Sequence, residues 1–252
     1  MVDTTHSEVD AAQGEAVGPA DASHTALEDL LAVIAHELRA PLTVVHTAAE
    51  TIATGHLSPE QLGPLLQVIR RNAELAMLLT DRLGLARAVE VGEVDLDAVE
   101  LDLVALVAET VADLGPSVAK QHDLEVRGAG PIRVVAGETS LREILLNLLL
   151  NAVKYSPEGS TIEVTVAVDD GVVTLAVRDH GCGVAADDTA RIFDKYTQVD
   201  GMAPGVGLGL YISRGLARAN GGDLVLDTAT GDGSRFILQL DVAPDAATSV
   251  TA

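Results

Sequence analysis

Three polar side chains lie at regular spacing in an otherwise apolar stretch, LREILLNLLLNAVKYSPEG, which begins at Leu141. Asn147, Asn151 and Lys154 are four and three residues apart, so they share one face of a helix. Carboxamide oxygens suit Mg²⁺, and a lysine ammonium suits a phosphate. A solvated polar face is the alternative, but two carboxamides among so many leucines would be costly if buried without partners. The pattern favours a metal and phosphate site.

A short acidic and glycine-containing motif, VRDHGCGV, follows an expected strand. Asp179 precedes Gly181 and Gly183, and a carboxylate at a strand end can accept the exocyclic amine of adenine. The glycines would let the backbone approach the ring closely. An ordinary turn is the alternative, because this spacing alone is a weak signal. We expect Cys182 to pack in this segment and to take no part in catalysis.

A second glycine-rich segment, APGVGLGLYIS, runs into an expected helix. Gly205, Gly207 and Gly209 would present backbone N–H groups to a phosphate at the helix N-terminus. The G-x-G-x-G spacing and the lack of a preceding strand exclude a Rossmann fingerprint. The chain also has no Walker A motif and no H-R-D or D-F-G pair, so it is not a P-loop enzyme or a Ser/Thr-type kinase.

A histidine with an acidic neighbour lies in AHELRAPLT, near the start of the chain. His36 is followed by Glu37, and Pro41 falls inside the same expected helix, where proline bends the chain and costs about 3 kcal/mol. An exposed imidazole beside a carboxylate is a competent nucleophile near neutral pH. A helix-surface histidine is the alternative, and it would be preferred for His36 taken alone.

Hydrophobic periodicity divides the chain into two parts. Residues 26–90 predict a helical hairpin, with Ser58 capping the second helix and Pro59 at its first position. Two helices cannot enclose a core, so we expect a second copy to complete a four-helix bundle. After an acidic connector at 91–100, residues 101–243 alternate between helices and strands. This α+β pattern predicts a two-layer domain with a mixed sheet covered by helices; residues 1–25 and 244–252 are expected to be disordered.

The elements expected in the second part are specific enough to be tested. They comprise helices at 102–121, 140–156, 187–193 and 207–221, strands at 122–128 and 132–137, a hairpin over 160–179 closed at Asp170-Gly171, and a final hairpin over 223–242.

The composition limits the classes of function. The 252 residues are 48% hydrophobic but only 2% aromatic, which predicts an aliphatic core. A formal net charge of −22 argues against direct nucleic-acid binding, which relies on Lys and Arg. One cysteine excludes a disulfide framework, and no apolar run approaches the ~20 residues of a membrane span. We therefore expect a cytoplasmic protein without a membrane segment.

Rare residue types gather in the motifs. Four of the five aromatic residues, and two of the three lysines, lie within or beside them. These residues are Tyr155, Phe193, Tyr196 and Tyr211, with Lys154 and Lys195. Such a concentration indicates one site suited to a planar ring and phosphates.

Taken together, the motifs resemble the five boxes of the sensor histidine kinases of two-component systems. AHELRAPLT resembles the phosphoacceptor box, LLNLLLNAVKYSPEG the asparagine box, RDHGCGV and GVGLGLYIS the two glycine boxes, and IFDKYTQ the phenylalanine box. Each box is weak alone, but all five occur in the family order over residues 25–242. The resemblance implies a dimeric phosphotransfer hairpin followed by an ATP-binding domain of the GHKL type.

The resemblance also implies a role for each matching residue. His36 would accept the phosphoryl group of ATP with Glu37 as its base partner, before transfer to an aspartate in the receiver domain of a response regulator. Asn151 would hold Mg²⁺, assisted by Asn147. The other expected nucleotide-binding residues are Lys154, Tyr155, Asp179, Gly181, Gly183, Lys195, Gly205, Gly207, Gly209 and Leu210, with Lys195 near the γ-phosphate and a lid over roughly residues 194–206.

One departure from the family pattern concerns the reverse reaction. The family often has Thr or Asn four residues after the histidine, where it positions water for dephosphorylating the regulator. Here that residue is Ala40, so we expect weak phosphatase activity. Two alternative functions stay open: a GHKL ATPase without histidine phosphotransfer, and a nucleotide-binding scaffold that transfers no phosphate.

Overall fold

The computed structural model describes residues 19–118, 121–197, 206–228 and 232–243, in the order of a helical hairpin and then an α+β domain. Residues 1–18 of the expected disordered leader, and the whole of the expected tail, lie outside these residues. Residues 19–25, which were also expected to be disordered, belong to the first helix. The helices are α1 (Pro19–Ala53), α2 (Pro59–Val91), α3 (Leu103–Val118), α4 (Glu138–Tyr155) and α5 (Gly209–Ala219). The strands are β1 (Ala98–Asp102), β2 (Asp123–Gly128), β3 (Arg133–Gly137), β4 (Thr161–Asp169), β5 (Val172–Arg178), β6 (Asp223–Asp227) and β7 (Arg235–Asp241).

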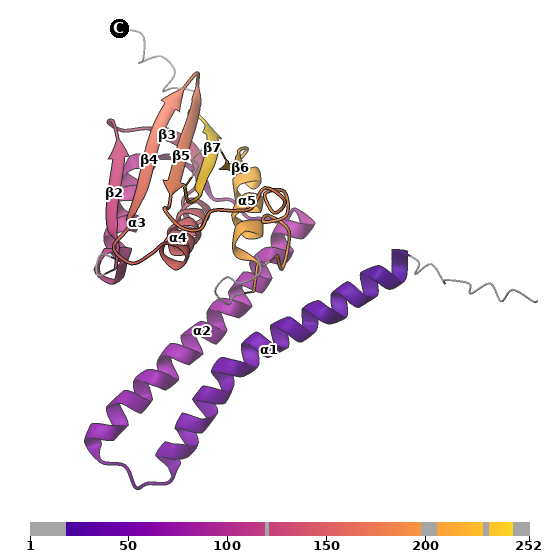
Figure 1. The fold of residues 1–252 in the computed structure, drawn as a ribbon, viewed down its shortest axis with the longest axis vertical. Helices are drawn as coiled ribbons and strands as arrows, with labels where there is room; N and C mark the ends of the chain where they lie inside the picture. The colour runs from indigo at the N-terminus through magenta and orange to yellow at the C-terminus, as the bar shows by residue number, and fades with distance from the viewer. Residues whose placement is uncertain (1–18, 119–120, 198–205, 229–231, 244–252) are drawn as a thin grey trace, which may run out of the picture.

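The hairpin has the two helices that the periodicity predicts. Ser58 is the N-cap of α2, with Pro59 following it, and the Ser58 N–H donates to Gln61 Oε1 at 3.0 Å. Pro41 lies inside α1, and Figure 1 shows that α1 bends along its length and diverges from α2. The two helices pack through small buried positions, of which Ala48 is 5% exposed. None of the described helices combines the length and hydrophobicity of a membrane span.

The α+β domain is built on a mixed five-stranded sheet in the order β2-β4-β5-β7-β6. Only β2 and β4 pair in parallel; the other neighbours are antiparallel. The turn between β4 and β5 has φ of 46° at Asp170 and 81° at Gly171, the left-handed pair that a two-residue hairpin loop requires. Helices α3, α4 and α5 lie on one face of this sheet (Figure 1). The expected two-layer architecture is therefore confirmed.

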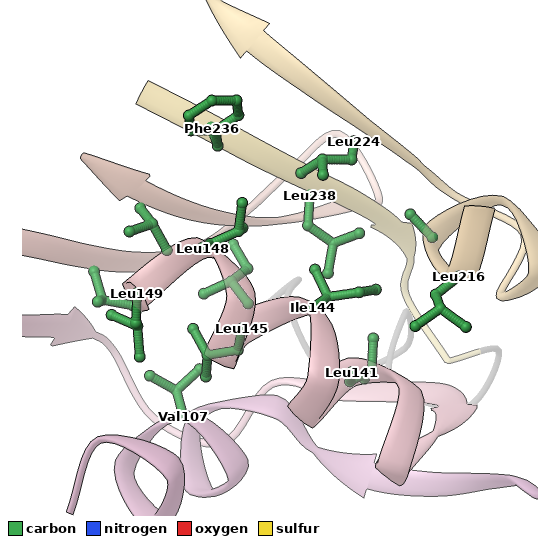
Figure 2. Close-up of a cluster of buried hydrophobic side chains, with 14 of the residues drawn as sticks. Val107, Leu141, Ile144, Leu145, Leu148, Leu149, Leu216, Leu224, Phe236 and Leu238 are labelled. Carbon is green, nitrogen blue, oxygen red and sulfur yellow. The ribbon is translucent and has the colours of Figure 1, made fainter. Parts of the chain in front are cut away.

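The core forms where α4 meets that sheet face, as Figure 2 shows. Alternate residues of the strands point toward the helices, so that β4 contributes Ile162 and Val164, both fully buried. The buried face of α4 supplies the largest aliphatic cluster, made of Leu141, Ile144, Leu145, Leu148 and Leu149. As the composition predicts, the buried core is almost entirely aliphatic; Phe193 and Phe236 are its two phenylalanines.

Two expectations about the elements were wrong in detail. The acidic connector overlaps a strand, because residues 98–102 form β1 and pair antiparallel with β3 in a separate two-stranded sheet. The segment expected as a helix at 187–193 forms successive turns, closed by bonds such as Arg191 N–H to Asp188 O at 2.9 Å. After these turns Tyr196 has φ of 62°, in the left-handed region. Phe193 packs edge-on against Phe236.

One asparagine joins the end of α5 to the start of α4. Asn220 Oδ1 accepts the Gly137 N–H at 2.8 Å, and Asn220 Nδ2 donates to Ser140 Oγ at 2.8 Å and to Leu216 O at 2.7 Å. The Gly137 N–H immediately precedes α4, so this side chain fixes the position at which α4 begins relative to α5. The contact links α4, which carries the polar face described above, to α5.

Asn220→Ala should therefore lower the free energy of unfolding by about 2–3 kcal/mol, because the Gly137 N–H loses its acceptor and Ser140 Oγ keeps only its bond to Gly137 O. Urea unfolding followed by circular dichroism measures this. Asn72→Ala is the control, since the Asn72 amide donates to Val68 O within its own helix. Equal losses in the two variants would contradict the structural role of Asn220.

Candidate functional site

A cavity opens beside the polar face of α4 and collects side chains from both parts of the chain. From α4 it receives Asn147, Asn151, Lys154 and Tyr155. The remainder of the α+β domain supplies Asp179, Cys182, Gly183, Val184, Ile192, Thr197, Val206, Gly207, Leu208, Gly209, Leu210, Ser234 and Phe236, and α2 supplies Leu79 and Arg82. Most of the residues singled out in the sequence thus meet at one place. Cys182 is exposed on the cavity wall and is not packed, contrary to our expectation.

The polar face of α4 is held against α5 by a buried hydrogen bond. Asn147 is 5% exposed, and its Nδ2 donates to Ser213 Oγ at 2.9 Å. A Cβ at Gly209 would lie 2.3 Å from Asn147 Oδ1, so only glycine allows this approach. Asn151 lies one turn further along the same face, half-buried at the cavity. Lys154 Nζ lies 4.9 Å from the centre of the Tyr155 ring.

Asp179 is a buried carboxylate at the end of β5. It is 5% exposed, and its Oδ1 accepts the backbone N–H groups of Gly181 at 2.9 Å and Ser234 at 3.1 Å. Burial raises the pKa of Asp179 above the ordinary aspartate value, although the hydrogen bonds from Gly181 and Ser234 act in the opposite direction. The backbone bonds fix the carboxylate in a wall of the cavity, where it can accept a hydrogen bond from a ligand amine.

Two glycines make room for Asp179. Gly181 does not itself line the cavity, but a Cβ there would lie 2.4 Å from the Tyr155 carbonyl oxygen. A Cβ at Gly233 would lie 1.9 Å from the Asp179 carbonyl oxygen, and Gly233 has φ of 77°. Both positions need glycine because the backbones of separate elements approach too closely for a side chain. The absence of side chains at these two positions allows the end of α4 and the segment before β7 to pack against the loop after β5.

The two ends of the expected lid are joined at its base. The Tyr196 N–H donates to Gly207 O at 2.8 Å, and Gly207 has φ of 68°. A Cβ at Gly207 would lie 2.7 Å from backbone atoms of Tyr196 and Thr197. Most of the expected lid, 194–206, and Gly205 within it, lie outside the described residues.

Lys195 is not among the residues that line this cavity. Its Nζ lies 2.6 Å from Glu90 Oε1 of α2 and 5.1 Å from the centre of the Tyr211 ring. Burial alone would lower the pKa of Lys195, but Glu90 and Tyr211 together raise it, and Lys195 lowers the pKa of Glu90. In this arrangement Lys195 joins the α+β domain to the hairpin, and a contact with the γ-phosphate would require it to leave Glu90.

His36 and Glu37 lie apart from the cavity, on α1. The His36 side chain is exposed and Glu37 is half-buried. Neither makes an ion pair with another described residue. An exposed imidazole is accessible to a phosphoryl donor, but the structure does not bring His36 and the cavity residues into one site.

The sequence motifs did not indicate several residues at the site, among them two serines, two residues of α2 and apolar wall residues such as Val184 and Leu208. Ser213 and Ser234 are hydrogen-bond partners whose role depends on distant elements, and no local pattern indicates them. Leu79 and Arg82 reach the cavity from α2, on a face that continues through Ala86 at i, i+3 and i+4 spacing. That periodicity was visible, but it also fitted the packing of the hairpin.

No three His, Cys, Asp or Glu side chains gather into a metal cluster in the parts of the chain that the structure describes. The oxygen donor at the cavity that best suits Mg²⁺ is the Asn151 carboxamide, because Mg²⁺ commonly takes one or two protein ligands and completes its shell with phosphates and water. The cavity thus has a buried carboxylate in one wall, and carboxamide and cationic side chains in the others. This set of groups fits an adenine ring with phosphates and one metal ion.

Two family models match the chain. Residues 26–90 match the His Kinase A (phospho-acceptor) domain, and residues 136–244 match the histidine kinase-, DNA gyrase B- and HSP90-like ATPase. The sensor histidine kinase GacS of Pseudomonas protegens is 29% identical over 96% of this chain, which corresponds to 27% of the GacS length. The chain therefore spans about a quarter of that relative.

Solved structures give the same arrangement of elements. Full-length ShkA in complex with AMPPNP is similar with a TM-score of 0.65 and 28% identity, over 86% of this chain and 46% of that one. The histidine kinase ThkA in complex with the response regulator protein TrrA is similar with a TM-score of 0.64 and 22% identity, over 89% of this chain and 64% of that one. The second likeness concerns the fold alone.

Asp179→Asn should weaken the binding of ADP by about 10- to 100-fold, since a charge-assisted hydrogen bond contributes about 1.5–3 kcal/mol. Isothermal titration calorimetry checks this, with Asp187→Asn, an exposed residue outside the cavity, as the control. The affinity of the wild type should also fall as the pH is lowered through the raised pKa of Asp179, because protonation removes the acceptor. An affinity that Asp179→Asn leaves unchanged would exclude the adenine contact.

Proposed function

Because this chain belongs to the sensor histidine kinase family, we propose that it transfers the γ-phosphoryl group of ATP to His36 and then to an aspartate of a response regulator. The observation that carries this proposal is the cavity in which Asp179, Asn151 and Lys154 meet, in a chain that also presents an exposed His36 on a separate hairpin. We assign phosphotransfer and dimerisation to residues 26–90, the linker to 91–100 and ATP binding to 101–243.

In the nucleotide site, Asp179 would accept the adenine amine and thereby fix the base against the end of β5. Lys154, with Asn147 and Asn151, would neutralise and orient the phosphates, and the glycines would let the backbone approach them. The negative charge that develops on the phosphates would be neutralised in part by Mg²⁺ when it is bound. Asn151 is the residue that we assign to hold it.

The transfer itself would need His36 to reach the γ-phosphorus. The lone pair of an imidazole nitrogen forms the new P–N bond, while the bond to the bridging oxygen of ADP breaks and its electrons remain on ADP. Glu37 would take or orient the proton of the imidazole from its half-buried position. Because His36 is exposed on α1 and not in the cavity, the reaction requires a movement of the α+β domain relative to the hairpin.

The response regulator is the second substrate that we propose. ThkA, a structural neighbour, is described in complex with a response regulator protein, and an exposed phosphohistidine on the hairpin would be open to such a partner. Ala40, four residues after His36, offers no polar atom, and the Thr43 hydroxyl donates to Arg39 O at 2.7 Å. Dephosphorylation of the regulator through this helix face should therefore be weak. We also propose a cytoplasmic location, because the proposed phosphoryl donor is ATP.

We propose that the chain forms a dimer, because the hairpin leaves apolar side chains uncovered. The exposed members are Leu42, Val44, Leu62, Leu66, Val68, Leu75, Met77 and Leu78. Two packed helices leave these side chains in water, and a second copy would cover them in a four-helix bundle. The match to the phospho-acceptor domain over residues 26–90 supports the same conclusion.

Incubation with Mg-ATP labelled at the γ-phosphate should label the wild type in an acid-labile, base-stable form. His36→Gln and Asn151→Ala should each abolish the label, because the first removes the acceptor and the second removes the metal ligand. His46→Gln is the control, since His46 is an exposed histidine on the same helix beside Glu50.

The negative outcomes distinguish the alternative functions. ATP hydrolysis without a label on His36 would indicate a GHKL ATPase, and ATP binding without either reaction would indicate a scaffold. If the label survives in His36→Gln, the acceptor has been assigned to the wrong residue.

The double variant Leu75→Glu/Leu78→Glu should convert the dimer to a monomer, because two charges on adjacent turns cannot be buried in a helical bundle. Light scattering after size-exclusion chromatography gives the mass relative to the 26.0 kDa chain. Val168→Glu/Val172→Glu, at exposed positions of the β4–β5 hairpin, is the matched control and should leave the dimer intact. A dimer that survives the first pair of substitutions would locate the interface elsewhere.

A further inference from the structure

The C-terminal half of α2 packs against α5 through a contact that only glycine permits. Ala86 of α2 is 5% exposed, and a Cβ at Gly215 of α5 would lie 2.1 Å from Val89 Cγ1. The Lys195–Glu90 ion pair, with 2.6 Å between Nζ and Oε1, lies at the same junction. These contacts hold one face of α2 against the nucleotide-binding domain.

The same face of α2 continues from this contact to the cavity. Val89, Ala86 and Arg82 are three and four residues apart, and Leu79 follows after three more, so all four lie on one side of the helix. Leu79 and Arg82 line the cavity together with Asn151 and Lys154 of α4. Docking of α2 on α5 therefore brings a hairpin residue, Arg82, into the wall of the nucleotide site.

The charge of Arg82 has no counter-ion among the described residues. The side chain is half-buried, and no ion pair or hydrogen bond joins it to another described group. This is unusual in a chain with 38 acidic and 16 basic residues, where most described arginines have a carboxylate partner. Arg82 and Lys154 thus present two cationic groups to one cavity, which is the arrangement expected for a polyphosphate. A guanidinium, moreover, can bind phosphate oxygens through two parallel hydrogen bonds.

We propose that Arg82 contacts the phosphates of the bound nucleotide, so that the hairpin completes the nucleotide site when α2 is docked on α5. This inference rests on the proposed binding of ATP in the cavity. It has a regulatory consequence: a nucleotide that is bound more tightly in the docked arrangement must favour that arrangement by the same factor. Since His36 lies outside the cavity here, the contact would retain the nucleotide while the chain awaits the movement that brings the two together.

The first test compares the binding of Mg-ADP and of adenosine to Arg82→Gln by calorimetry, using the full chain. We expect the Kd of Mg-ADP to rise about tenfold, the loss typical of one charge-assisted hydrogen bond, and the Kd of adenosine to stay unchanged. Arg71→Gln is the matched control, because Arg71 is exposed on the same helix and does not line the cavity. Arg82→Lys should recover part of the affinity for ADP.

Two results would overturn the proposal: an unchanged Kd for ADP in Arg82→Gln, or equal losses for ADP and adenosine, which would indicate a structural role only. Neither result would contradict the proposed kinase activity. That proposal is contradicted if the wild type binds no ATP or if His36 is not labelled.

A second test asks whether docking of α2 delivers Arg82 to the site. Val89→Asp buries a charge against Gly215 and should undock α2 without changing any residue of the cavity. It should weaken ADP binding by about the same factor as Arg82→Gln, and the double variant should be no weaker than either single variant. Additive losses, or full affinity in Val89→Asp, would contradict the dependence on docking.

Discussion

The constraint on which this structure depends is that one helix, α4, must serve the core and the site at the same time. Its apolar face, with Leu141, Ile144 and Leu145, is buried against the sheet and the neighbouring helices, which leaves the helix no freedom to rotate (Figure 2). Asn147 and Asn151 therefore point in a direction that core packing fixes. The polar residues are positioned by the free energy of burying leucines, and they do not have to be ordered by the ligand.

Close backbone contacts then set the shape of the cavity. Gly181 lies against the Tyr155 carbonyl, Gly209 against the Asn147 carboxamide and Gly233 against the Asp179 carbonyl. In each case the missing Cβ allows two elements that are far apart in the sequence to touch. These three glycines thus act as packing residues between separate elements of the domain, and the phosphate-binding role that we propose for the glycine-rich segments would depend on that packing.

The hairpin and the α+β domain are joined through the C-terminal part of α2. Ala86 belongs to the core of the α+β domain, Val89 lies against Gly215, and Lys195 pairs with the exposed Glu90. The proposed transfer to His36 would require this contact to open so that the two parts can meet in another arrangement. The exposed His36 on one part and the cavity on the other are consistent with that requirement.

Local patterns were sufficient for most elements and for the residues of the polar α4 face. Helical spacing predicted α1, α2, α4 and α5, and alternation with an Asp-Gly turn predicted the β4–β5 hairpin, because these elements are specified by neighbours in the sequence. The motifs, in their order, were enough to indicate a nucleotide site with Asp179 and Asn151. Strand β1 was missed because it is stabilised by pairing with β3, 35 residues away, and by no strong pattern of its own.

What only the tertiary structure decided is which groups meet. Helical spacing predicted that Asn147 lies on the polar face of α4. Its hydrogen bond to Ser213, 66 residues further along the chain, depends on how α4 packs on α5. Lys195 belongs to a nucleotide motif by sequence, yet the docking of α2 pairs it with Glu90. Arg82 has no motif at all and reaches the cavity only because Gly215 admits Val89. Sequence determines what each helix face can bind, whereas long-range packing determines which faces share a site.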